Sequence, residues 1–114
     1  MTDTHEVLLV QTTFPADRAD ECLHAMRTLV EERLVGCAQV LATEIHSVFR
    51  WEGEQQQEQE ILVLLKTCEA RWEALQERLV ELHPYEVPEM VACPARASQA
   101  YGAWLHRQCR PAAS

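Results

Sequence analysis

The sequence predicts one α+β domain, in which strands and helices follow the order β-α-β-β-α-β and a short helix comes last. Two continuous apolar runs, 7–10 and 61–65, have the length and composition of buried strands. Residues 19–34 and 68–82 repeat apolar side chains at the spacing of a helix. Residues 37–51 include an alternating stretch, which is typical of a half-buried strand. These three patterns together predict the fold class.

The first strand is the run 7–10, and Thr12-Thr13-Phe14-Pro15 is expected to end it and open a helix. Thr13 is the expected N-cap, because a threonine hydroxyl can accept a hydrogen bond from a free N–H of the first turn. Acidic residues follow where the helix dipole is positive. Gly36 is the expected residue just past the helix end, because glycine readily adopts the left-handed conformation found there.

Residues 37–51 are expected to form one extended strand, and Glu52-Gly53-Glu54 the turn that ends it. Alternation places four side chains of this strand on one face: Ile45, Ser47, Phe49 and Trp51. The next strand begins in a polar stretch and becomes apolar over 61–67. Two strands joined by so short a turn predict a long antiparallel hairpin.

The second helix is expected to begin at a Thr67 cap and to end before Pro84. Proline cannot continue a helix, and it pushes the preceding residue, His83, toward extended geometry.

A short strand over 89–93 is expected to end at Pro94, and a last helix within 97–109 has Ser98 as its candidate cap. The whole order is that of the split β-α-β, ferredoxin-like arrangement. Both helices then cover one face of an antiparallel sheet. The other face has no cover within the chain, and residues 1–114 form a single domain with a core of about 7–108.

Composition restricts the function classes. A length of 114 residues suits one domain, and 47% hydrophobic with 25% charged residues is typical of a globular protein. A net charge of -8 disfavours nucleic acid and anionic membranes as partners. The first residues lack a basic region and an apolar run long enough for export or membrane insertion, so a cytoplasmic location is expected. The five scattered cysteines are expected to be free thiols.

The long hairpin predicts an assembly of several copies. The 15 residues of 37–51 span roughly 50 Å at about 3.3 Å per residue, whereas a compact domain of this length is about 35 Å across. The hairpin must therefore bend or project. A projecting hairpin would expose Val48, Phe49 and Trp51 to water, and pairing with another subunit would cover them. The alternative is a bulge near Ala42-Thr43 without assembly.

The segment from His83 to Glu89 is the strongest candidate for a site. It holds an imidazole, a phenol and two carboxylates in a stretch that two prolines make stiff. The alternative is a rigid connector between a helix and a strand. The five histidines show no zinc spacing, and three glycines in the whole chain leave no glycine-rich phosphate loop. With no nucleophile motif either, no catalysis is expected.

Five segments stand in the chain as an ordered set: Glu31–Ala38, Phe49–Gly53, Leu65–Thr67, His83–Glu89 and Tyr101–Leu105. Together they resemble the CutA family, often called divalent-cation-tolerance proteins. The resemblance covers roughly residues 7–108. It implies a ferredoxin-like subunit in a tight cytosolic homotrimer that is linked to metal-ion tolerance and binds copper or another divalent cation.

The resemblance also implies metal binding, and His83 is then the expected ligand. Glu86 and Glu89, the carboxylates of the same segment, are expected to add oxygen ligands or to hold the histidine through a hydrogen bond. Some bacterial members carry a cysteine at the position of Thr12 and a histidine at the position of Leu82. This chain keeps only His83 of that set. Cu(I) favours thiolates and imidazoles, and Cu(II) favours imidazole and oxygen ligands, so a tight site would need His83 from more than one copy.

A cleft between subunits would gather residues from the hairpin and the His83 segment: Cys37, Trp51, Lys66 and Tyr85. A second hypothesis places a small-molecule ligand in this cleft, by analogy with trimeric PII-type signal proteins. A third, an acylphosphatase-type enzyme on the same fold, needs an arginine in the first loop. The corresponding loop, 11–17, has none. The leading expectation is therefore a non-enzymatic, metal-binding homotrimer.

Overall fold

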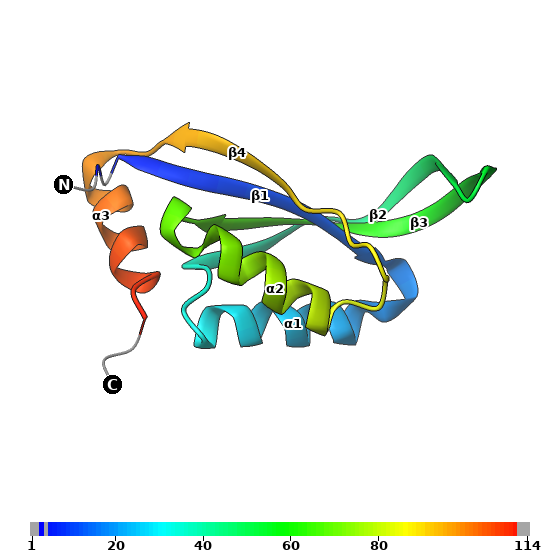
Figure 1. Ribbon diagram of the computed structural model, residues 1–114, viewed down its shortest axis with the longest axis horizontal. Coiled ribbons are helices and arrows are strands. Elements are labelled where there is room, and N and C mark those ends of the chain that lie inside the picture. The colour runs from blue at the N-terminus through cyan, green and yellow to red at the C-terminus, as the bar shows by residue number, and fades with distance from the viewer. Residues whose placement is uncertain (1–2, 4, 112–114) are drawn as a thin grey trace.

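The strands of the computed structural model, which describes residue 3 and residues 5–111, form one antiparallel sheet in the order β2-β3-β1-β4 (Figure 1). The elements along the chain are β1 (Glu6–Pro15), α1 (Ala19–Glu31), β2 (Cys37–Trp51), β3 (Glu54–Thr67), α2 (Trp72–Leu82), β4 (Val91–Arg96) and α3 (Gln99–Gln108). Short 3-10 turns, η1 (Ala16–Arg18) and η2 (Glu69–Arg71), precede α1 and α2. This confirms the predicted split β-α-β order with its additional helix.

The two longer helices lie side by side on the same face of the sheet, and α3 closes one end (Figure 1). The opposite face is not covered by α1 or α2. Three leucines of β1 and β3, each only half-buried, lie on that face: Leu9, Leu62 and Leu64. Val91 of β4 is 59% exposed there. One subunit thus leaves an apolar sheet face open to water.

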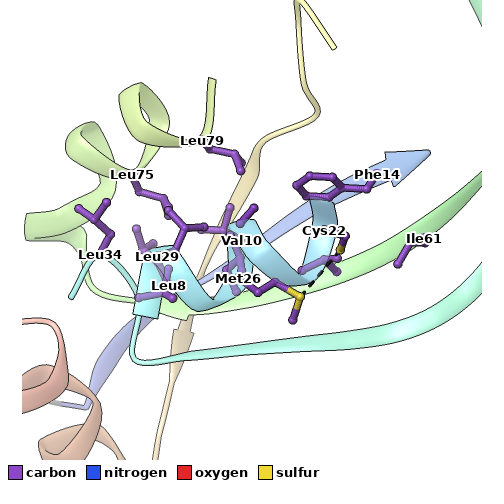
Figure 2. Packing of buried hydrophobic residues seen from close by; sticks show 14 residues of the cluster. Leu8, Val10, Phe14, Cys22, Met26, Leu29, Leu34, Ile61, Leu75 and Leu79 are labelled. Atoms are coloured by element: carbon purple, nitrogen blue, oxygen red, sulfur yellow. Dashed lines mark hydrogen bonds between the residues drawn. The ribbon is translucent and has the colours of Figure 1, made fainter. Parts of the chain in front are cut away.

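The main core fills the space between the sheet and α1 and α2 (Figure 2). Val10 and Val63 from the sheet and Leu75 and Leu79 from α2 are completely buried. Burying one such side chain contributes about 1.5–3 kcal/mol. A smaller cluster of Val7, Cys68, Leu105 and Cys109 holds α3 against the end of the sheet.

Two of the three predicted helix caps are wrong, because each threonine lies in a strand and the helix it was expected to cap begins at a later residue. Thr13 lies within β1, pairs with Leu62 and does not cap a helix. Thr67 is the last residue of β3, and its hydroxyl donates a hydrogen bond to Leu34 O at 2.7 Å. The third cap is confirmed, since Ser98 Oγ accepts the Tyr101 N–H at 3.3 Å.

Gly36 has a different role from the predicted one. Helix α1 already ends at Glu31, and Arg33 takes the left-handed conformation with φ 61°. A Cβ on Gly36 would lie 2.4 Å from Leu105 Cδ1, and the Gly36 N–H donates to Lys66 O at 2.9 Å. The glycine therefore allows α3 to pack closely against the start of β2.

The predicted end of the last strand at Pro94 is also wrong. β4 runs through Pro94, which pairs with Leu8, and continues to Arg96. β4 is an edge strand. An edge strand tolerates proline because only one of its sides needs N–H donors.

The β2–β3 hairpin projects beyond the rest of the sheet (Figure 1), and the molecule extends 47 Å along its longest axis. Its turn is the predicted one, with Glu52 and Gly53 both at positive φ, as a two-residue turn between strands requires. The register shifts between Val40 and Ala42 and again between Ala42 and Ile45. The sequence analysis offered this bulge as the alternative to a projecting hairpin, and the structure contains both.

All five cysteines are free, as expected. Within the described ranges, no helix has both the length and the apolar character that crossing a bilayer requires.

Candidate functional site

The segment that follows α2 is anchored by the ring of His83. Pro84 ends the helix, and His83 takes the expected extended conformation, with φ -95° and ψ 140°. The imidazole is only 8% exposed. It packs against Phe14 and Tyr85, with ring centroids 4.2 Å and 5.0 Å away. His83 therefore sits beneath the segment, against the end of β1.

Both ring nitrogens of His83 are engaged in hydrogen bonds. Nδ1 accepts the Tyr85 N–H at 3.0 Å, so the ring proton is assigned to Nε2, which donates to Thr13 O at 2.6 Å. Burial lowers the pKa of His83, which favours this neutral form. A metal ion could bind the imidazole only by displacing one of the two hydrogen bonds.

Tyr85 fastens the segment to β3. Its hydroxyl donates to Glu60 Oε2 at 3.0 Å, and the Glu60 side chain is itself 5% exposed. Burial, together with the Glu60 carboxylate, raises the pKa of Tyr85, so the phenol remains a donor. This hydrogen bond gives the buried Glu60 carboxylate a donor, which offsets part of the cost of removing it from water.

A cleft of about 530 Å³ opens between the hairpin and the His83 segment. It is lined by Pro15, Phe49, Trp51, Gln56, Glu58, Pro84, Tyr85, Glu86 and Val87. Its oxygen atoms come from two carboxylates, an amide and a phenol, which are groups that hard divalent cations accept. Its aromatic rings provide stacking surface for an organic ligand.

The three predicted metal ligands occupy different surroundings. Glu86 lines the cleft and is exposed. His83 lies buried beneath it, and Glu89 Oε2 accepts a hydrogen bond from Gln11 Nε2 at 3.0 Å. Over residue 3 and residues 5–111, no three histidine, cysteine or acidic side chains are grouped closely enough to hold a metal ion. A metal site at these residues stays a prediction, and one subunit does not assemble it.

The four predicted cleft residues form two separate pairs. Trp51 and Tyr85 share the cleft described above. Cys37 pairs with Lys66 at the other end of β2, and the Lys66 ammonium lies 5.5 Å from the centre of the Tyr101 ring. These two pairs would meet only if subunits associated so that the hairpin of one reached the sheet of another.

Thr12 and Leu82, the two positions that the sequence analysis compared with metal-binding residues of the family, belong to the core. Thr12 is fully buried, and among the described side chains its Oγ1 is a buried oxygen without a hydrogen-bond partner. Leu82 packs against the main apolar cluster. Neither residue faces the cleft.

Glu58 and Glu60 were not predicted as site residues, because they belong to a polar stretch without an obvious motif. The register of the hairpin is the signal that could have found them. The turn at 52–53 pairs Glu58 with Ser47 and Glu60 with Ile45, and thus places both carboxylates beside the predicted face that carries Phe49 and Trp51.

Comparison with known proteins identifies the family. Residues 8–108 match the family described as CutA1 divalent ion tolerance protein. The chain belongs to this family. It is 40% identical over 101 residues to the divalent-cation tolerance protein CutA of Thermus thermophilus, covering 88% of this chain and 93% of that protein. The CutA of Pyrococcus horikoshii is 40% identical over 85 residues, 75% of this chain and 79% of that one.

Solved structures of CutA1 proteins confirm the fold. The Thermus thermophilus structure superimposes with a TM-score of 0.83 at 37% identity, covering 90% of this chain and 97% of that one. The Oryza sativa CutA1 structure gives 0.84 at 30% identity, covering 95% and 98%. A rice relative is named chloroplastic, so family membership does not by itself assign a compartment, and the cytoplasmic location stays a prediction.

Proposed function

We propose that this CutA protein acts without catalysis, as a homotrimer that binds a divalent cation such as copper at the cleft between the hairpin and the His83 segment. The main support for this proposal is the composition of the cleft. The Glu58 and Glu86 carboxylates and the Gln56 amide lie there beside an exposed apolar hairpin. A role in divalent-cation tolerance fits the names of its relatives.

Two exposed apolar surfaces support assembly. One is the uncovered sheet face around Leu62 and Leu64, and the other is the hairpin, where Val48 is 62% and Trp51 44% exposed. Surfaces of this kind are characteristic of protein interfaces rather than of isolated subunits. Assembly would also give the cleft a second wall and bring it further donors.

The donors that line the cleft favour oxygen coordination. Glu86 is exposed and free to turn toward a cation, whereas His83 is held by Thr13 and Tyr85. In this proposal, Glu86 and Glu58 are the first ligands to test. His83 positions the segment through its two hydrogen bonds, and Glu89 orients Gln11.

Light scattering coupled to gel filtration tests the assembly. The wild type is expected at three times the 13.1 kDa of one chain. Leu64→Glu places a charge on the uncovered sheet face and is expected to give single chains. Val80→Glu, on the exposed side of α2, is the matched control and should remain assembled. A wild type that elutes at 13.1 kDa at all concentrations would refute the trimer.

Calorimetric titration with Cu²⁺ tests the cation site. Glu86→Gln and Glu58→Gln keep the side-chain shape and remove the charge, so each is expected to weaken binding by about tenfold or more, as loss of a charged ligand does. Glu73→Gln, on α2, is the control. Unchanged Cu²⁺ binding in both cleft variants would show that the cleft is not the cation site. Equal binding by wild type and His83→Ala, with folding verified by circular dichroism, would show that His83 is neither a ligand nor needed to position the segment.

A small-molecule sensor is the second candidate, because Phe49, Trp51 and Tyr85 give the cleft three aromatic walls. A PII-type sensor would bind an organic ligand there rather than a bare cation. The variant Trp72→Phe/Trp104→Phe keeps Trp51 as the one tryptophan of the chain. Quenching of its fluorescence by a metabolite extract passed through a chelating resin would favour the sensor. Quenching that disappears with the metal would favour the cation.

A further inference from the structure

Cys68 and Cys109 are brought together at the end of the sheet that lies farthest from the hairpin turn. Cys68 directly follows β3, and Cys109 directly follows α3. Both thiols are free and buried, and both belong to the small cluster around Leu105. The Thr67 hydroxyl lies 3.6 Å from Cys109 Sγ and helps to fix that thiol in place.

The two sulfurs line an open cavity of about 550 Å³ between the start of η2 and the end of α3. The charged side chains on its wall are of both signs: Asp3, Glu6, Glu69, Arg71, His106 and Arg110. Both cysteines border this cavity, and Cys68 is 6% exposed whereas Cys109 is 1% exposed.

The two thiols differ in acidity because one stabilises the other. A hydrogen bond from the Cys109 thiol lowers the pKa of Cys68, and His106 and the N–H groups of Ala70 and Arg71 add to this effect against the cost of burial. The same hydrogen bond, with burial, raises the pKa of Cys109. Cys68 is therefore the more acidic thiol of the pair.

The other cysteines show how specific this environment is. Cys22 is buried in the main core, its thiol lies 3.8 Å from Met26 Sδ, and burial raises its pKa. Cys93 is exposed on the edge strand β4, where its thiol contacts Pro94 O. The thiolate is the form of cysteine that reacts with peroxide, and a second thiol nearby can convert the product into a disulfide. Of the five cysteines, Cys68 has a lowered pKa and shares its cluster and cavity with Cys109.

We propose that Cys68 and Cys109 form a peroxide-reactive dithiol that closes into a disulfide. In the first step the Cys68 sulfur attacks one oxygen of hydrogen peroxide, an S–O bond forms, the O–O bond breaks, and the leaving hydroxide takes a proton to become water. In the second step the Cys109 sulfur attacks the Cys68 sulfenic acid, an S–S bond forms, and the S–O oxygen leaves with the Cys109 proton as water. Two thiols lose two electrons, and one peroxide becomes two waters.

The disulfide would tie the β3–α2 junction to the end of α3. Without it, α3 is held by the Leu105 cluster and by the hydrogen bond between His106 Nε2 and Glu6 O at 2.7 Å. The site lies away from the cation cleft and shares no residue with it. A negative result for the dithiol would therefore not bear on the proposed cation binding.

Peroxide titration of the reduced full-length chain, followed by alkylation and non-reducing peptide mapping, tests the proposal. The expected product has lost two hydrogen atoms and contains a peptide pair linked through Cys68 and Cys109. Cys68 is expected to react about tenfold faster at pH 7 than Cys93, which is the internal control on the same molecule. The oxidised form should melt at a higher temperature than the reduced form.

Two variants separate the steps. Cys109→Ser removes the resolving thiol, so Cys68 is expected to stop at a sulfenic acid that dimedone captures. Cys68→Ser is expected to leave Cys109 unmodified at the same dose. Oxidation of Cys93 before Cys68, or absence of the Cys68–Cys109 link once Cys93 is fully oxidised, would overturn the proposal. Both variants are first compared with the wild type by circular dichroism, and the wild-type mapping stands alone if either fails to fold.

Discussion

The base and the tip of the β2–β3 hairpin are built from the same two strands under different constraints. At the base, Val63 and Leu65 of β3 are sealed beneath the helices, and at most 1% of either side chain is exposed. At the tip, Val48 is 62% and Trp51 44% exposed. The base is stabilised by its own chain. The apolar residues of the tip contribute little to the fold of one subunit, which is why they indicate a surface that another molecule covers.

The largest expected effect lies at the base. Leu79→Ala removes a completely buried side chain that α2 packs against the sheet, and it should lower the free energy of unfolding by about 2–5 kcal/mol. Urea denaturation followed by circular dichroism measures this. Val80→Ala, one residue along the same helix and 47% exposed, is the control. Equal losses in the two variants would show that the base is not the stabilising region.

The contact between the His83 segment and the hairpin comes next. Tyr85→Phe keeps the ring and removes the hydroxyl that donates to the buried Glu60. The carboxylate loses this partner, so a loss of about 1–3 kcal/mol is expected in the same denaturation. Tyr101→Phe, on exposed α3, should change stability much less. A neutral Tyr85→Phe would mean that water replaces the phenol without cost.

The protonation of His83 is expected to have a smaller effect on stability, and this effect depends on pH. Burial lowers its pKa in the folded state, so the unfolded chain binds the proton more readily. This contribution to stability is complete above the unfolded pKa of about 6.5. It is lost as pH falls from there toward the folded pKa. Melting temperatures between pH 7.5 and pH 5 should therefore fall more steeply for the wild type than for His83→Asn. The exposed His46→Gln should follow the wild type, and a His83→Asn curve parallel to the wild type would contradict this role.

The smallest expected effect on stability concerns the contact between α1 and α2, the two helices that cover the base of the hairpin. Arg78 joins α2 to α1 through two hydrogen bonds to Glu32, of 2.9 and 3.0 Å, and all these groups are in contact with water. Exposed ion pairs contribute little and are screened by salt. Arg78→Gln should lower the melting temperature slightly at low salt, and the difference should vanish near about 1 M salt. A difference that survives high salt would indicate a packing role for the arginine stem.

The sequence was informative wherever a local rule decided the structure. Alternation and helical spacing predicted the order of the elements, the pair Glu52-Gly53 predicted the turn, and Ser98 was recognised as a cap. The predictions for Thr13, Thr67 and Gly36 failed where a distant segment decided instead. Strand pairing extends β1 past its apolar run and keeps Thr67 within β3, and Leu105 of α3 requires a glycine at position 36.

The candidate site shows the same division. The stiff segment from His83 to Glu89 was identified from its composition, and it does border a cleft. The engagement of both His83 nitrogens could not be foreseen, because one partner is the backbone oxygen of Thr13, seventy positions away in the chain. The pairing of Tyr85 with Glu60 likewise depends on tertiary contacts. Whether the metal ligands assemble depends on contacts beyond one subunit, which no pattern within one chain specifies.

Because of the two register shifts near Ala42, the direction in which the hairpin points can change while the pairing of its strands stays the same. The extra residues of β2 are taken up there, so deleting one of them would leave the partners on either side unchanged and remove only a bend. The tip would keep every hydrogen bond and point elsewhere. A change of chain length at 41–44 is therefore a way to redirect the hairpin without altering its pairing, and a graft of this hairpin onto another sheet must include those residues.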